Sequence, residues 1–159
     1  MARIARLLAL SLVIGGSLVA PKVLAGPAHG QPGCGAATLT GAYGIQGSGA
    51  NLGVPVAFVG VLLFDGKGKV ITPSPVTANV GGTVDPIDVS GTYKVNPDCT
   101  ANAFVETVHH NLPRTTFHEI DMVVVSGGTE ALVMIGGVKN SQSEPPRPGE
   151  TLTGVLKRL

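Results

Sequence analysis

Residues 54–78 of the chain, VPVAFVGVLLFDGKGKVITPSPVTA, decide the fold class. Two runs rich in Val, Ile, Phe and Thr flank the tetrapeptide Asp65-Gly66-Lys67-Gly68, and runs of this type separated by glycine-containing turns are typical of β-strands. Apolar residues do not recur here at the three-and-four spacing of a helix. We therefore expect one strand at 54–64, a tight turn, and a second strand at 69–78.

The same alternation of β-forming runs and turn residues continues on both sides. Further strands are expected at 38–47, 82–85, 87–95, 100–110, 115–125, 129–138 and 151–158. Asn96-Pro97-Asp98 and two glycine pairs mark turns. Since 23 glycines and 12 prolines interrupt the helical patterns, we expect an all-β domain of about eight strands.

So many strands joined by short turns must either close on themselves or leave edges open to other chains. A small closed antiparallel barrel removes those edges completely, so it is the expected architecture. A two-sheet β-sandwich is the alternative.

The first 25 residues have the features of a secretory signal peptide. Arg3 and Arg6 precede an apolar run at 7–20, and Val23-Leu24-Ala25 matches a cleavage pattern of small residues. We expect residues 26–36 to be a flexible leader because they are rich in Gly and Pro. Residues 37–159 would form a single domain, secreted or periplasmic and without a membrane span.

Cys34 and Cys99 are the only cysteines. In an oxidising compartment such a pair persists as a disulfide, which we expect here. Lipid attachment at Cys34 is a weaker interpretation, because this residue lies well beyond the apolar run. A metal site would need more ligands at close spacing.

Charge and motifs exclude several functional classes. Formal net charge is +1, and no Lys/Arg cluster indicates a nucleic-acid or polybasic membrane surface. Gly47-Ser48-Gly49 lacks the frame of a catalytic serine elbow, and no helix follows it to bind phosphate. We expect no catalytic residue, cofactor or metal.

The segment 104–125 holds the one concentration of titratable residues. If Leu112 and Pro113 form the turn, His109 faces Thr116 and Thr107 faces His118. The face that carries no carboxylate would then point into the barrel, with the two histidines as diagonal neighbours near one mouth. The expected ligand-binding residues on this face are Thr107, His109, Thr116, His118 and Met122. Alternatively, the histidines are hairpin-tip residues that face water.

Several strings in the chain resemble a family of small exported bacterial proteins: TLTGAYG at 38–44, FDGKG at 64–68, GTYKVNPDCT at 91–100 and VVSGGTE at 124–130. Members of that family carry one Cys before the first strand and one in the Asn-Pro-Asp-Cys-Thr turn. The resemblance implies a barrel of the allene-oxide-cyclase and dirigent (calycin-like) type, whose interior binds apolar ligands. It transfers no catalytic residue to this chain.

Two functions are expected from these patterns. The first is a non-enzymatic exported barrel that binds a small apolar molecule or serves as a surface or secreted interaction module. The alternative is a cyclase or isomerase that orients a small apolar substrate in the barrel interior. Whether the interior is hollow distinguishes a ligand-holding barrel from one filled by side chains.

Overall fold

The computed structural model describes residues 33–112, 114–145 and 147–159. The expected signal peptide lies outside the described residues, as do residues 26–32 of the expected leader. The described part consists of η1 (Ala36–Thr38), β1 (Thr40–Asn51), β2 (Val54–Asp65), β3 (Lys69–Ile71), β4 (Val76–Val80), β5 (Thr83–Val95), β6 (Thr100–His109), β7 (Thr115–Val125), η2 (Ser126–Gly128), β8 (Glu130–Lys139) and β9 (Glu150–Arg158).

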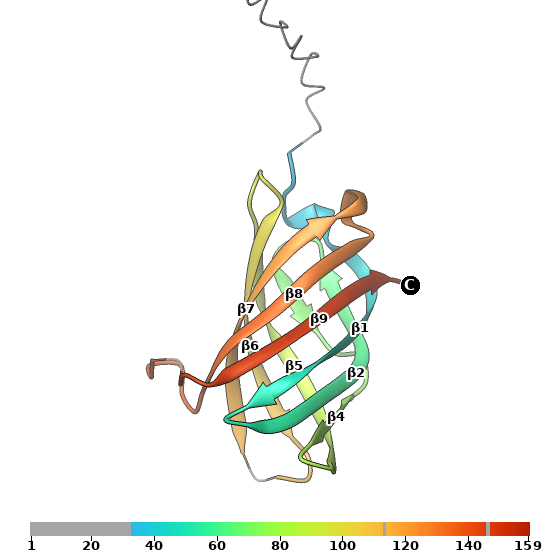
Figure 1. Cartoon of the computed structure of the whole chain (residues 1–159). Coiled ribbons are helices and arrows are strands. Elements are labelled where there is room, and N and C mark those ends of the chain that lie inside the picture. Colours follow the sequence, from blue (N-terminus) through green and yellow to red (C-terminus); the bar gives the residue numbers. More distant parts are fainter. Residues whose placement is uncertain (1–32, 113, 146) are drawn as a thin grey trace, which may run out of the picture. The chain divides into compact units, whose positions relative to one another are not determined.

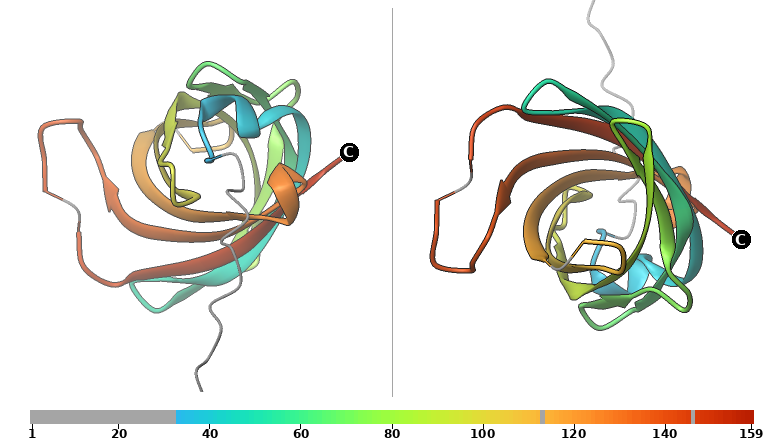
Figure 2. Two further views of the ribbon diagram at one scale, coloured as in Figure 1. Left: turned by 90° about the horizontal axis from the view of Figure 1, so that it is seen from above. Right: turned by 90° about the horizontal axis from the view of Figure 1, so that it is seen from below.

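The strands form a closed antiparallel barrel (Figures 1 and 2). Strands β5 to β9 follow one another around the barrel, and β1 closes it by pairing with both β9 and β2. Between β2 and β5 the position is shared by β3 and β4, which pair with different parts of the same two neighbours. The expected eight-stranded barrel is confirmed, with one extra strand, and the sandwich alternative is wrong.

The first strand, expected at 38–47, is β1 at Thr40–Asn51, and two of the expected divisions between strands are wrong. The run 69–78 is divided into β3 and β4, because Pro73 and Pro75 lie in the segment between them and proline cannot donate to a sheet ladder. Residues 82–85 and 87–95, expected as two strands, form the single strand β5. Pro86 has no backbone N–H to donate to the sheet, but its carbonyl accepts a hydrogen bond from the backbone N–H of His110 at 3.0 Å.

One end of the barrel is closed by aromatic side chains and by η1, which lies across the opening (Figure 2). Phe64 packs edge-on between Tyr43 and Tyr93, at ring-centroid distances of 5.3 and 5.1 Å. The Tyr93 hydroxyl donates to the carbonyls of Ala36 and Leu39, at 2.9 and 2.8 Å. These two bonds fix η1 over the barrel end.

A disulfide joins Cys34 to Cys99 at this closed end, with the two Cα atoms 5.0 Å apart. The expected bond is therefore confirmed. The backbone N–H of Cys34 also donates to the Pro97 carbonyl at 3.3 Å. Both contacts tie the segment before β1 to the β5–β6 turn, so the last residues of the expected leader at 26–36 are held against the barrel.

The opposite end of the barrel carries the connections β1–β2, β4–β5, β6–β7 and β8–β9. The first and last of these meet where the N–H of Leu52 donates to the Gly149 carbonyl at 2.8 Å. Leu52 itself is 65% exposed. Side chains alternate between a buried interior face and an exposed outer face along β6 and β7, as expected for barrel strands. No helix among the described residues is long and apolar enough to span a membrane.

Candidate functional site

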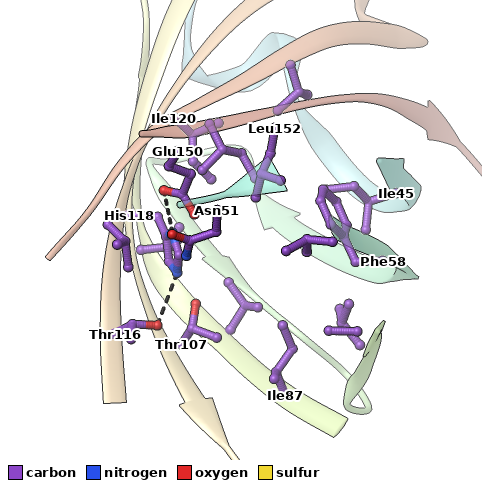
Figure 3. A pocket seen from close by; sticks show the side chains of 18 of the residues that line it. Ile45, Asn51, Phe58, Ile87, Thr107, Thr116, His118, Ile120, Glu150 and Leu152 are labelled. Atoms are coloured by element: carbon purple, nitrogen blue, oxygen red, sulfur yellow. Dashed lines mark hydrogen bonds and ion pairs between the residues drawn. The ribbon is translucent and has the colours of Figure 1, made fainter. Parts of the chain in front are cut away.

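The barrel is hollow toward its open end. It encloses a cavity of about 330 Å³, within the range of small-molecule sites. Most of the wall is apolar; the contributing residues include Ile45, Phe58, Leu62, Ile87, Val105, Ile120, Met122, Val133 and Leu152 (Figure 3). Glycines at 47 and 154 face each other across β1 and β9, and a Cβ at Gly47 would overlap the Phe58 ring. The strands can therefore approach closely around this space.

All five residues expected on the interior face line this cavity: Thr107, His109, Thr116, His118 and Met122. Thr107, Thr116 and Met122 are buried, and the side chain of His118 is 16% exposed. The water-facing alternative for His109 and His118 is therefore wrong. Their neighbour in sequence, His110, lies on the outer face, where its Nε2 binds the exposed carboxylate of Asp88 at 2.8 Å. That the interior residues bind a ligand stays a prediction.

The register of the β6–β7 hairpin differs from the expectation by two residues. Thr107 lies opposite Thr116, and His118 lies opposite Val105, so the predicted pairs His109–Thr116 and Thr107–His118 are wrong. A longer connection causes the shift, because Asn111 is drawn out of the hairpin toward the start of β5. Its backbone N–H donates to Asp85 Oδ1 at 2.9 Å, and its side chain donates to the Val84 carbonyl at 3.0 Å. A two-residue shift preserves which side chains face inward.

Asp85 is a buried carboxylate that contacts the cavity residue His109, and only 1% of its side chain is exposed. Burial alone would raise its pKa, but the hydrogen bonds from the Asn111 N–H and from His109, together with the nearby charge of Arg114, hold the pKa below its ordinary value. Asp85 Oδ2 and His109 Nδ1 are 2.5 Å apart. Asp85 is therefore ionised at neutral pH and fixes the orientation of the His109 ring.

Thr116 joins the two interior histidines. Its Oγ1 lies 3.2 Å from His109 Nε2 and 3.1 Å from His118 Nε2. The other ring nitrogen of His118, Nδ1, lies 3.5 Å from Glu150 Oε2, and the side chain of Glu150 is 1% exposed. Figure 3 shows His118 between Thr116 and Glu150 on one side of the cavity. We call the series Asp85, His109, Thr116, His118 and Glu150 the polar chain.

No known protein-family model matches this sequence, and neither the curated proteins nor the solved structures contain a significant match.

Two carboxylates of the polar chain escaped the sequence analysis. The short strand expected at 82–85 ends at Asp85, whereas in the structure Asp85 belongs to β5 and shares its interior face with Tyr93 and Val95. The strand expected at 151–158 begins one residue after Glu150, which lies two residues before the interior Leu152 and belongs to β9. In both cases the period of two was present, and extending each strand by a few residues would have placed the carboxylate inside.

The polar chain is not arranged as a metal centre. Among the described residues, no group of three or more His, Cys, Asp or Glu side chains is placed to hold a metal ion. The Nε2 atoms of His109 and His118 both face the Thr116 hydroxyl, while their Nδ1 atoms face carboxylates. The two rings are engaged as hydrogen-bond partners, which is the chemistry of a polar anchor or of acid–base groups.

Proposed function

We propose that this protein binds a small, largely apolar molecule inside its barrel and does so after export to the periplasm or the cell exterior. The observation that carries the proposal is the cavity of about 330 Å³, whose wall is apolar except for Thr107, four residues of the polar chain (His109, Thr116, His118 and Glu150) and a few residues at the mouth. Cavities of this kind typically hold a ligand by apolar burial and orient it through a small number of polar groups.

The rim of the cavity supports this proposal. Leu52 and Val54, at the β1–β2 turn, line the cavity although they are 65% and 41% exposed. Arg114 and Arg147 lie at the same end and also contribute to the lining. An apolar molecule approaching this end would meet apolar side chains before it reached the interior.

Export is supported by the Cys34–Cys99 disulfide, since disulfides persist in oxidising compartments. The expected signal peptide at 1–25 belongs to the same proposal. The resemblance to exported barrels of the allene-oxide-cyclase and dirigent type also agrees with a closed antiparallel barrel, but fold analogy by itself assigns no activity.

The test is binding of a neutral, environment-sensitive dye, N-phenyl-1-naphthylamine, together with native mass spectrometry of protein purified from its own host. We expect a fluorescence increase that saturates at one dye per barrel, and a co-purifying small molecule. Replacing both His109 and His118 by Ala should alter binding while the β-sheet circular dichroism stays unchanged, whereas His110→Ala should have no effect. If neither dye nor ligand is bound, the pocket is not a binding site, and a role as an interaction module is favoured.

A second candidate is a cyclase or isomerase that acts on an apolar substrate in the same cavity. It is favoured by one observation, the placement of His109, His118 and Glu150 on the cavity wall, where general acid–base groups would be within reach of a substrate. Chromatography of the co-purified ligand after incubation with fresh protein separates the two functions. Recovery of the unchanged molecule supports binding alone, and conversion to an isomer supports the enzyme.

A further inference from the structure

The direction of the hydrogen bonds in the polar chain follows from Asp85. An ionised carboxylate only accepts, so His109 Nδ1 must carry the hydrogen that Asp85 Oδ2 receives. With a neutral ring, His109 Nε2 then accepts from the Thr116 hydroxyl, and Thr116 Oγ1 in turn accepts from His118 Nε2–H. This assignment of tautomers, made from the hydrogen-bond chain, leaves His118 Nδ1 with a lone pair and no hydrogen.

The inner end of the chain therefore presents two acceptors side by side. His118 Nδ1 and Glu150 Oε2 are 3.5 Å apart, a distance too long for a good direct hydrogen bond. Both atoms are buried, and neither has a hydrogen-bond partner among the described residues. Buried polar atoms without partners are costly and uncommon in native proteins. Both residues line the cavity, although the two atoms themselves expose almost no surface to it, so a ligand group meets them when the His118 or Glu150 side chain turns.

The charges around the two ends of the polar chain, Asp85 and Glu150, also differ. Asp85 accepts hydrogen bonds from the Asn111 N–H and from His109, and the charge of Arg114 lies nearby. Among the ion pairs of the described residues, the partner of Glu150 is His118 alone. A buried carboxylate is stable only when a cation or several donors compensate it. Glu150 is therefore the carboxylate that lacks compensation when His118 is neutral.

We propose that His118 and Glu150 form a subsite for a primary amine, so that the ligand is an apolar molecule with one ammonium group. This inference rests on the proposed ligand-binding function and specifies its ligand. An ammonium group has three N–H donors, enough to bind Nδ1 and Oε2 together, and its charge compensates Glu150. A hydroxyl has one donor and no charge, and an ether has neither. The remaining body of the ligand packs against the apolar wall.

The experiment uses displacement of N-phenyl-1-naphthylamine from the full barrel by octylamine, octan-1-ol and octyl methyl ether, at neutral pH. These probes share the same apolar chain and differ at the polar end. We expect octylamine to displace the dye at a concentration at least about ten-fold lower than octan-1-ol. Equal displacement by the amine and the alcohol would overturn the subsite and leave the binding function standing. If the dye does not bind at all, the binding function fails and the subsite fails with it.

Variants test whether the charge of Glu150 causes the preference for octylamine over octan-1-ol. Glu150→Gln keeps the shape but removes the charge, so it should abolish the preference for octylamine over octan-1-ol. The matched control is Glu119→Gln, because Glu119 lies on the outer face, half-exposed and paired with Lys139; it should keep the full preference. Persistence of the preference in folded Glu150→Gln would refute the role of Glu150.

A measurement on the unaltered protein makes the test independent of variant folding. The ¹⁵N chemical shift of His118 Nδ1 should be that of an unprotonated nitrogen and should change on addition of octylamine, with a smaller change on addition of octan-1-ol. An Nδ1 shift that octylamine leaves unmoved would contradict the proposal.

Discussion

Asp85 holds His109 and the backbone of Asn111 with its two carboxylate oxygens, at 2.5 and 2.9 Å. One buried side chain of β5 thus determines where β6 ends and where the β6–β7 connection begins. It also sets the ring orientation from which the rest of the polar chain follows.

Replacement of Asp85 by Asn should lower the free energy of unfolding by about 2 to 3 kcal/mol at pH 7, the range for a hydrogen bond to a buried charge. Since its pKa is lowered in the folded state, the stabilisation is complete above the unfolded pKa of about 3.9 and is lost as the pH falls through the lower folded value. The difference from the unaltered protein should therefore shrink below about pH 4. Urea unfolding at several pH values measures this. Asp88→Asn, at a carboxylate that is 52% exposed, should change stability by less than about 0.5 kcal/mol.

Removal of the disulfide should destabilise the barrel without changing its cavity. Cys34 and Cys99 are 65 residues apart, and closing a loop of that length stabilises by roughly 4 kcal/mol in the chain-entropy model. We expect Cys34→Ser, Cys99→Ser and the double variant to lose similar amounts of stability in urea unfolding. A thiol count on unreduced, exported protein should find none free; two free thiols would contradict the bond.

The Tyr93 hydroxyl should contribute to stability and not to binding. Tyr93→Phe removes the donor shared by the Ala36 and Leu39 carbonyls, so the free energy of unfolding should fall by about 1 to 2 kcal/mol. Dye affinity should stay unchanged, because Tyr93 lies at the closed end and is not part of the cavity wall. A loss of dye binding with stability intact would show that the closed end takes part in the site.

Filling the cavity should abolish binding while the barrel still folds. Ala103 points into the cavity from β6, and Ala103→Phe introduces a ring there at a cost of about 1 to 3 kcal/mol in overpacking. The fluorescence of N-phenyl-1-naphthylamine should then not increase. Ala57→Phe adds the same ring to the exposed outer face of β2 and should leave dye binding intact. If Ala103→Phe binds dye normally, the dye occupies another site.

Zinc should not bind tightly, because two imidazoles are too few ligands and both are engaged in hydrogen bonds. Elemental analysis of purified protein should find far less than one zinc per chain. One zinc per chain in the unaltered protein, and none when both His109 and His118 are replaced by Ala, would show instead that the polar chain is a metal site.

The fold could be predicted from the sequence because barrel strands carry a strong local pattern, the alternation of inward and outward side chains. The alternation in 104–125 placed Thr107, His109, Thr116, His118 and Met122 on the inner face, and that assignment survives a two-residue error in register because side-chain direction has a period of two. The disulfide followed from there being only two cysteines.

The complete site could not be predicted from the sequence, because its residues come from strands that are distant in sequence. Glu150 reaches His118 only through the closure of the barrel by β8 and β9, and β8 contains a bulge between the residues opposite His118 and Ile120. The hairpin register depended on Asn111 binding Asp85 and Val84, a contact that no local pattern indicates. Tertiary hydrogen bonds of this kind override turn preferences.

Tyr43, Phe64 and Tyr93, with η1 packed over them, close one end of the barrel, so the cavity opens toward the other end. A molecule in the cavity would then leave through the end at which it entered, where Leu52 is part of the lining. A competitor can therefore bind only after the occupant has dissociated. Residence time should then be a property of the occupant and the rim alone, independent of how much competitor is added.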